Sequence, residues 1–314
     1  MKKIIEIIIT ITVIIILASC SSAKKGVDNT GKPNVNDTTN KNASLSSNQQ
    51  SQSQSEDTSP KIKDTNSNTN SNLLESMDTT KSQFEKGYYF YNGTINNNIP
   101  IRMSIYPLEK YMVGTYYYEK YGNEIKLKGK AGDKNIILYE YDETGKKTGI
   151  FKGTMSDTVG KIEGTWISAD NKISYPFVLK LEGGLGGVEY GKKYSLLVNN
   201  KSDEDVENFV SKIQSYIVNE NKEQLAEQIN YPINVKINGK TIKIHNKDEL
   251  IKNYEKIFDV AYKQKISKAP TKYLLASPQG IMVGLGLIWI NDVILADSSS
   301  KLMIIAINNQ NYAN

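Results

Sequence analysis

From Phe84 onward, apolar and polar residues alternate in short runs that are separated by Gly, Asn and Asp. Period-two alternation bounded by turn residues is typical of β-strands. The connections have hairpin length and no helical spacing interrupts them, which predicts an all-β antiparallel meander closed as a small barrel over residues 84–182. We expect about eight strands, at 87–95, 99–106, 111–118, 124–130, 135–141, 149–155, 161–167 and 173–181.

The spacing of apolar residues changes after residue 201, and residues 202–314 form a second expected domain of α+β type. Ser202 has the character of a helix N-cap, and Val206, Val210 and Ile213 then recur at helical spacing. A second short helix follows, and Asn238-Gly239 is a strong hairpin signal between two short strands.

Asn246, followed three residues later by Glu249, predicts a capping box at the start of a long helix. Its expected buried side comprises Leu250, Ile251, Tyr254, Ile257, Phe258, Ala261 and Tyr262. Strands are expected at 272–276, 281–290, 293–295 and 302–307. Between the two domains, residues 183–201 contain Gly183-Gly184 and Gly186-Gly187, which we interpret as a Gly-rich linker with a hinge.

The first residues have the order of an export signal. Lys2 and Lys3 precede an apolar run at 4–17, which is shorter than the ~20 residues that a spanning helix needs. Small residues and Cys20, the only cysteine of the chain, follow. The stretch Leu17-Ala18-Ser19-Cys20 resembles the lipobox of bacterial lipoproteins. This resemblance implies that residues 1–19 are a signal peptide, that a diacylglycerol is attached to the Cys20 sulfur, and that the protein is lipid-anchored on the extracytoplasmic face of the cell membrane.

Residues 20–83 are expected to be a disordered tether. Between residues 21 and 83 there is no Phe, Trp or Tyr, and Ser, Asn and Thr dominate. Such a segment cannot bury enough apolar surface to offset the entropy of ordering it. Its expected root-mean-square span is about 45 Å, which would let the folded domains work away from the lipid surface.

Charge and residue counts narrow the function classes further. The net charge of +5 over 314 residues, with no Lys/Arg block longer than two, gives no reason to expect a nucleic acid partner. One cysteine leaves no disulfide, and a single histidine, His245, excludes sites with two histidine ligands. We therefore expect no metal and no cofactor.

A Gly-Thr pair recurs at Gly93, Gly114, Gly153 and Gly164. The last copy, in "KIEGTWISADNKISYPFVLKL", resembles the G-T-W strand starts of avidin-like ligand-binding barrels. That resemblance implies a barrel interior that holds a ligand. A barrel of this length can also be filled by its own side chains, with the glycines at bends. Both interpretations stay open at this point.

The element order of the C-terminal domain, with "YPINVKINGKTIKIHNKDELIKNYEKIF", "QGIMVGLGLIWIN" and "LMIIAINN", resembles the nuclear-transport-factor-2-like superfamily. The resemblance implies a cone-shaped domain, in which enzymes place Asp, His or Tyr on the concave face. The expected central strand at 281–290 contains no ionisable residue. A cone pocket would instead be lined by Tyr254, Phe258, Asp259, Tyr262 and Trp289, and we predict no catalytic residue among them.

The sequence therefore predicts a non-enzymatic binding or protein-interaction module at the cell envelope. One alternative is a lipoprotein that binds a small molecule or glycan. Another is an enzyme with an acid or base inside the cone. The expected partners are the membrane, through Cys20, and an envelope protein, glycan or small ligand.

Overall fold

The computed structural model describes residues 74–156 and 158–310, and all of them belong to a single compact unit, Ile62–Asn314. The expected signal peptide, the lipobox Leu17-Ala18-Ser19 with Cys20, and the tether up to residue 73 lie outside the described residues.

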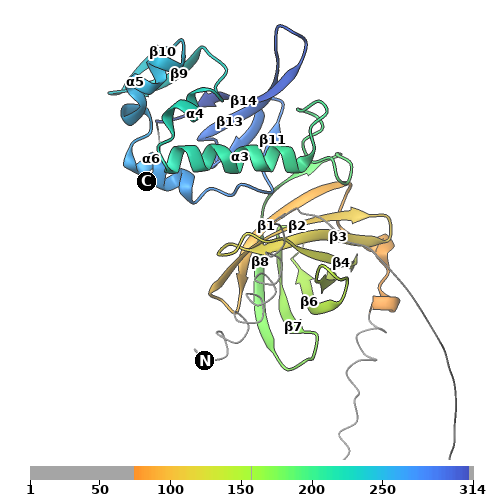
Figure 1. Ribbon diagram of the computed structural model, residues 1–314. Helices are drawn as coiled ribbons and strands as arrows, with labels where there is room; N and C mark the ends of the chain where they lie inside the picture. Colours follow the sequence, from red (N-terminus) through yellow and green to blue (C-terminus); the bar gives the residue numbers. More distant parts are fainter. Residues whose placement is uncertain (1–73, 157, 311–314) are drawn as a thin grey trace, which may run out of the picture. The chain divides into compact units, whose positions relative to one another are not determined.

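Eight antiparallel strands form a closed barrel in sequence order, and β1 pairs with β8 to complete it (Figure 1). The strands are β1 (Gly87–Ile95), β2 (Ile99–Leu108), β3 (Tyr111–Tyr118), β4 (Ile125–Gly132), β5 (Asn135–Tyr141), β6 (Lys147–Met155), β7 (Lys161–Ser168) and β8 (Ser174–Gly186). The predicted meander barrel is confirmed, because the alternation of apolar residues gives every strand one face toward a common interior.

The barrel interior is filled by side chains. Its core includes Tyr91, Tyr116, Phe151 and Phe177, each of them almost fully buried. The Gly-Thr repeats have a packing reason: a Cβ on Gly93 would collide with the carbonyl oxygen of Val178 on the neighbouring strand. The glycine therefore allows the close approach of β1 and β8 at the point of closure.

Strand β8 is longer than expected and takes in most of the predicted glycine hinge. Gly183 pairs with Phe90 and Gly184 with Tyr89. A Cβ on Gly183 would lie 2.6 Å from a methyl carbon of Leu275. Gly183 thus lets Leu275, from the C-terminal part, pack directly against the backbone of β8. Gly183 and Gly184 are paired strand residues and do not act as a flexible joint.

Residues 74–84 also belong to the fold, although 20–83 were expected in the tether. They include a short 3₁₀ helix, η1 (Thr79–Lys81), whose end lies against the β4–β5 turn, where the Asp133 amide donates to the Lys81 carbonyl over 2.9 Å. Phe84 is buried in the barrel core, and its ring contacts Tyr89 edge-on. One aromatic side chain therefore fixes the segment on the barrel.

The C-terminal part combines helices with two small sheets (Figure 1). The helices are α3 (Asp203–Val218), α4 (Lys222–Ala226), α5 (Lys247–Ile257) and α6 (Val260–Ser267), and the strands are β9 (Ile233–Ile237), β10 (Lys240–Ile244), β11 (Leu275–Ser277), β12 (Gly280–Val283), β13 (Ile288–Ile294) and β14 (Ser300–Ile307). Strands β9 and β10 form the expected hairpin, and β11 to β14 form a four-stranded antiparallel sheet. Within the described residues, no helix combines the length and the apolar character needed to cross a membrane.

Two expected elements of this part are divided in the structure. The long helix breaks after Ile257, and Asp259 caps a new helix by accepting the amide of Tyr262 over 2.8 Å. The expected strand at 281–290 is a tight hairpin, because Gly284, Leu285 and Gly286 all adopt left-handed backbone conformations between β12 and β13. Apolar spacing continues through both breaks, so periodicity alone did not reveal them.

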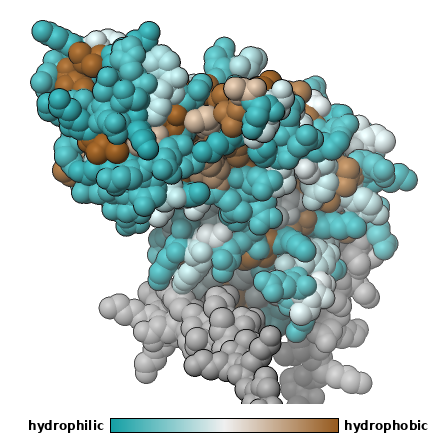
Figure 2. Space-filling model, turned by 45° about the horizontal axis from the view of Figure 1, so that its top comes forward, coloured by the Kyte–Doolittle hydropathy of each residue, from teal (hydrophilic) through white to brown (hydrophobic). Residues whose placement is uncertain are grey.

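The two parts share one hydrophobic core. Tyr88, Phe90, Tyr106 and Tyr117, which point outward from the barrel, belong to the same buried cluster as the apolar residues of α3, α5, α6 and the four-stranded sheet. The face shown in Figure 2 is mostly hydrophilic with scattered apolar patches.

Replacing Phe84 tests whether the segment before β1 is a structural part of the barrel. We expect Phe84→Ala to lower the free energy of unfolding by about 3 kcal/mol, because a large buried side chain is lost. Lys81→Ala, in which an exposed side chain is truncated on the same segment, should change it by less than about 0.5 kcal/mol. Urea unfolding measures both. Equal, small effects would show that residues 74–84 do not support the barrel.

Candidate functional site

Tyr273 joins the barrel to the C-terminal sheet. Its ring stacks on Phe90 at 6.0 Å between centroids and tilts against Tyr117 at 5.3 Å. Its hydroxyl lies 2.7 Å from Oγ1 of Thr115 on β3. The Thr115 hydroxyl gives its proton to Glu124, so the Tyr273 hydroxyl is the donor to Thr115. Burial raises the pKa of Tyr273 well above its ordinary value, so the phenol stays neutral.

Glu207 on α3 holds the backbone on both sides of this junction. Its side chain is almost fully buried, and one carboxylate oxygen accepts from Lys193 Nζ at 2.9 Å and from the Tyr194 hydroxyl at 3.1 Å. The same oxygen accepts the amide of Tyr273 at 3.3 Å, while the Tyr194 oxygen accepts the amide of Leu274 at 3.1 Å. The segment that enters β11 is thereby tied to α3.

Arg102 on β2 and Glu182 on β8 form a forked ion pair on the outside of the barrel. The two nitrogens of the guanidinium lie 2.5 and 3.3 Å from the two carboxylate oxygens of Glu182. Nε of Arg102 also donates to Glu119 at 3.2 Å. Two parallel hydrogen bonds fix the guanidinium plane, so this pair forms a rigid wall.

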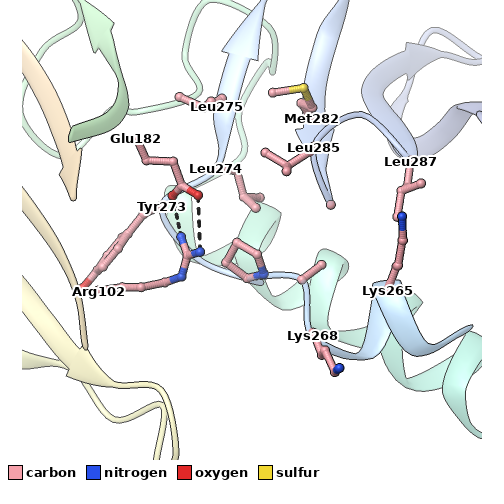
Figure 3. Close-up of a pocket in the computed structure, with 13 residues that line it drawn as sticks. Arg102, Glu182, Lys265, Lys268, Tyr273, Leu274, Leu275, Met282, Leu285 and Leu287 are labelled. Atoms are coloured by element: carbon pink, nitrogen blue, oxygen red, sulfur yellow. Dashed lines mark hydrogen bonds and ion pairs between the residues drawn. The ribbon is translucent and has the colours of Figure 1, made fainter. Parts of the chain in front are cut away.

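A cleft of about 480 Å³ lies beside this pair, between the barrel and the C-terminal part (Figure 3). Its lining comprises Arg102, Glu182, Lys265, Lys268, Ala269, Pro270, Tyr273, Leu274, Leu275, Met282, Gly284, Leu285 and Leu287. The floor is apolar, and the charged groups stand at opposite ends: the ion pair of the barrel at one and two lysines from the end of α6 at the other.

Leu285 forms one edge of the cleft and is the most exposed large apolar residue of the described chain, with 83% of its surface accessible. Its φ of +57° lies in the left-handed region, which branched side chains disfavour. A leucine in this position is unfavourable for folding on two counts, since it exposes apolar surface and strains the backbone. Glycine or asparagine would suit the turn better, which points to a role outside folding.

The combination defines the chemistry that the cleft accepts. Leu275, Met282 and Leu285 offer apolar contact, and Lys268 places an ammonium group at the rim. A ligand with an apolar body and an acidic group fits both features.

The five residues predicted to line a cone pocket do not line this cleft. Tyr254 and Tyr262 are buried, and their hydroxyls donate to the backbone carbonyls of Ile217 and Leu287. Phe258 is fully buried between the two tyrosine rings. Asp259 is exposed and caps α6, and Trp289 is half-buried on β13.

The tryptophan of the G-T-W stretch lies inside the barrel beside a buried carboxylate. Trp166 Nε1 donates to Glu140 at 3.0 Å, and the hydroxyls of Tyr116 and Thr148 donate to the same carboxylate, each over 2.6 Å. Burial and the neighbouring Glu140 charge raise the pKa of Tyr116 well above its ordinary value. Three donors from the barrel therefore satisfy the Glu140 carboxylate within the barrel interior.

Within residues 74–156 and 158–310, no cluster of three or more His, Cys, Asp or Glu side chains has the arrangement of a metal site. His245 precedes α5, where its backbone amide donates to Glu249. No protein-family model matches this chain, and no curated protein matches it significantly in sequence.

Sequence reasoning missed the cleft because its walls come from β2, β8, α6 and the β12–β13 turn, which only the three-dimensional fold brings together. One signal was present: "GLG" at 284–286 places a leucine between two glycines inside an apolar run. Glycines flanking one large residue predict a turn that exposes it.

The network next to the cleft should give a pH-dependent stability. Burial alone would raise the pKa of Glu124, but hydrogen bonds from Lys272 and Thr115 and the Lys272 charge lower it below its usual value. A carboxyl group whose pKa is lowered by folding stabilises the folded state at pH values above its unfolded pKa, which is about 4.3 for Glu. This stabilisation is lost as the pH falls through the pKa of the folded state.

We expect Glu124→Gln to lower the free energy of unfolding by about 1 kcal/mol at neutral pH. The difference in free energy of unfolding between this variant and the wild type should decrease steadily below about pH 4. Urea unfolding over this range measures it, with Glu163→Gln, an exposed carboxylate of the same barrel, as the control. A gap that stays constant or widens on acidification would contradict the assignment.

Proposed function

We propose that this chain is a lipid-anchored, non-enzymatic binding module on the extracytoplasmic face of the cell membrane, and that it captures a partner protein at the cleft beside Leu285. The stretch Leu17-Ala18-Ser19-Cys20 supports the anchor, since its order after a basic start and an apolar run is that of a lipoprotein signal. The anchor and the cleft are separate parts of the proposal and are tested separately.

The observation that carries the binding function is the exposure of Leu285 in a left-handed turn. An apolar side chain held at the rim of an apolar cleft loses its unfavourable exposure when a partner covers it. The neighbouring Lys268 favours an acidic partner, because an apolar segment with a carboxylate would contact both the apolar floor and this ammonium group at the rim.

The same chemistry supports a second candidate, a small apolar anion. The cleft volume of about 480 Å³ falls in the range of ordinary ligand pockets. A protein segment is the stronger proposal, because the most exposed apolar group stands at the edge of the cleft and not in its floor.

We further propose that residues 202–314 form a divergent nuclear-transport-factor-2-like domain. The order of two helices, a hairpin, further helices and a four-stranded antiparallel sheet supports this. The paired hairpin β9–β10 forms a sheet of its own, and α5 and α6 replace one long helix. Function on this fold is decided by the site, and here the geometry favours binding.

Replacing the thiol tests the anchor. In the producing bacterium, the Cys20→Ser chain should move from the membrane fraction to the soluble or secreted fraction and lose its acyl mass, because two or three acyl chains are what holds it. Mass spectrometry and membrane fractionation measure this. A Ser19→Ala chain, which keeps the thiol and a small residue, is the control and should stay acylated. Unchanged fractionation and processing of Cys20→Ser would refute the anchor.

A fluorescent apolar sulfonate, 8-anilinonaphthalene-1-sulfonate, tests the chemistry of the cleft. We expect saturable binding to the wild type, and about ten-fold weaker binding to both Leu285→Asp and Lys268→Glu, since each removes one half of the recognition.

Leu196→Asp is the matched control, because Leu196 is 80% exposed and does not line the cleft. Its binding should equal that of the wild type, and near-ultraviolet circular dichroism checks that each variant keeps its packing. Equal weakening by the Leu196 and Leu285 variants, or none by either, would show that the probe binds elsewhere.

A further inference from the structure

The outer faces of β4, β5 and β6 carry a second surface with its own chemistry. Inward positions of these strands, such as Leu127, Leu138 and Phe151, belong to the barrel core. The alternate positions therefore point outward. On β4 they are three lysines in a row, Lys126, Lys128 and Lys130.

The strand register places these lysines beside aromatic and apolar residues. Lys126 is opposite Tyr141 and Lys128 is opposite Tyr139 on β5. On the other side of β5, Lys147 is opposite Tyr141. We call this surface the cationic face, and it consists of Tyr111, Lys126, Lys128, Lys130, Tyr139, Tyr141 and Lys147.

No Asp or Glu occupies an outward position on β4, β5 or β6. Glu140, the acidic residue of β5, points into the barrel core. Asp133, Asp142 and Glu143 lie in the turns at the strand ends, and Asp142 accepts hydrogen bonds within its own turn. On the next strand, by contrast, Lys161 is paired with Glu163. The lysines of the cationic face thus form a continuous positive patch.

The positive groups lie over aromatic rings. Nζ of Lys147 is 3.9 Å from the centroid of the Tyr139 ring, and Nζ of Lys128 is 4.6 Å from that of Tyr111. A ring holds the ammonium group without neutralising it, so the charge remains available to an outside anion. Amphipathic tyrosines among lysines match the interface of an anionic bilayer, where rings sit at headgroup depth and cations meet phosphates.

We propose that the cationic face docks on the anionic phospholipid headgroups of the membrane. The charge pattern supports this occupant, and so does the route of the chain: Nζ of Lys130 donates to the carbonyl of Leu74, where the described chain begins. In its biological setting the inference rests on the proposed anchor, because residues from Cys20 onward would lead to this face. Docking holds the cleft at a set height above the bilayer.

Vesicle flotation with the full Cys20→Ser chain tests membrane docking by the cationic face in the absence of the proposed acyl anchor. Neutral vesicles consist of phosphatidylcholine, and anionic ones contain about 30 mol% phosphatidylglycerol; salt is set at about 50 mM or about 500 mM. The N-terminal apolar run can bind both lipids alike, so the readout is the ratio of partitioning onto anionic and neutral vesicles. We expect a large ratio at low salt that collapses at high salt.

Lys126, Lys128 and Lys147 are all exposed, so their replacement by Gln should leave the fold intact. Each lysine near an anionic surface contributes about five-fold in partitioning, so the triple variant should lose about 100-fold of the ratio. The control variant replaces Lys240, Lys243 and Lys247, which are exposed on β10 and the start of α5, with Gln. This control has the same net charge as the first triple variant, and its partitioning ratio should fall by less than about three-fold. Near-ultraviolet circular dichroism verifies the packing of both variants.

If the two triple variants lose the same fraction of the partitioning ratio, the proposal that the cationic face docks on the membrane is overturned, because net charge alone would then explain the binding. A ratio of one for the Cys20→Ser chain would also overturn it, and so would binding to soluble inorganic polyphosphate without binding to anionic vesicles. Failure of the anchor is distinguishable, because it appears as absent acylation of the wild type and leaves the flotation ratio unaffected.

Discussion

The buried carboxylate of Glu207 is the interaction on which the arrangement of the C-terminal part against the barrel depends. It has little access to water, so its charge must be met by Lys193, the Tyr194 hydroxyl and the Tyr273 amide. These partners come from the segment after β8 and from the segment before β11. One charged group on α3 therefore fixes both connections at once, and removing any partner would leave a buried charge poorly compensated.

With these connections fixed, the aromatic side chains on the outside of the barrel become core residues. Phe90 and Tyr117 would be exposed on an isolated barrel, but here they pack around Tyr273. The barrel and the C-terminal part are consequently packed against each other through a shared core and are not joined only by a flexible linker. The cleft depends on the same contact, because Tyr273 and Leu275, which line it, pack directly against the barrel.

Local signals predicted local structure well. The strands β1, β3 and β5 begin and end where alternation and turn residues place them, and Ser202, Asn246 and Asn238-Gly239 act as the expected caps and turn. What the sequence did not reveal depends on partners far along the chain. In the sequence, Gly183 looks like part of a hinge, but in the structure Leu275 packs against it. Asp259 looks like a carboxylate in the middle of a helix, but the helix ends at Ile257 and Asp259 caps the next one. The cleft and the cationic face needed the fold and the strand register, respectively.

Barrel closure has a consequence for the order in which the chain can fold. Gly87, at the start of β1, pairs with Gly186, at the end of β8, so the first strand has only one of its neighbours until the last one has been made. The seam also excludes a side chain at Gly93, which leaves little tolerance for a shifted register. Pairing between such distant segments slows folding, since the loop entropy must be overcome before the contacts form. A nascent chain that has emerged only as far as β7 would still carry two open strand edges, and the completed ring removes them both.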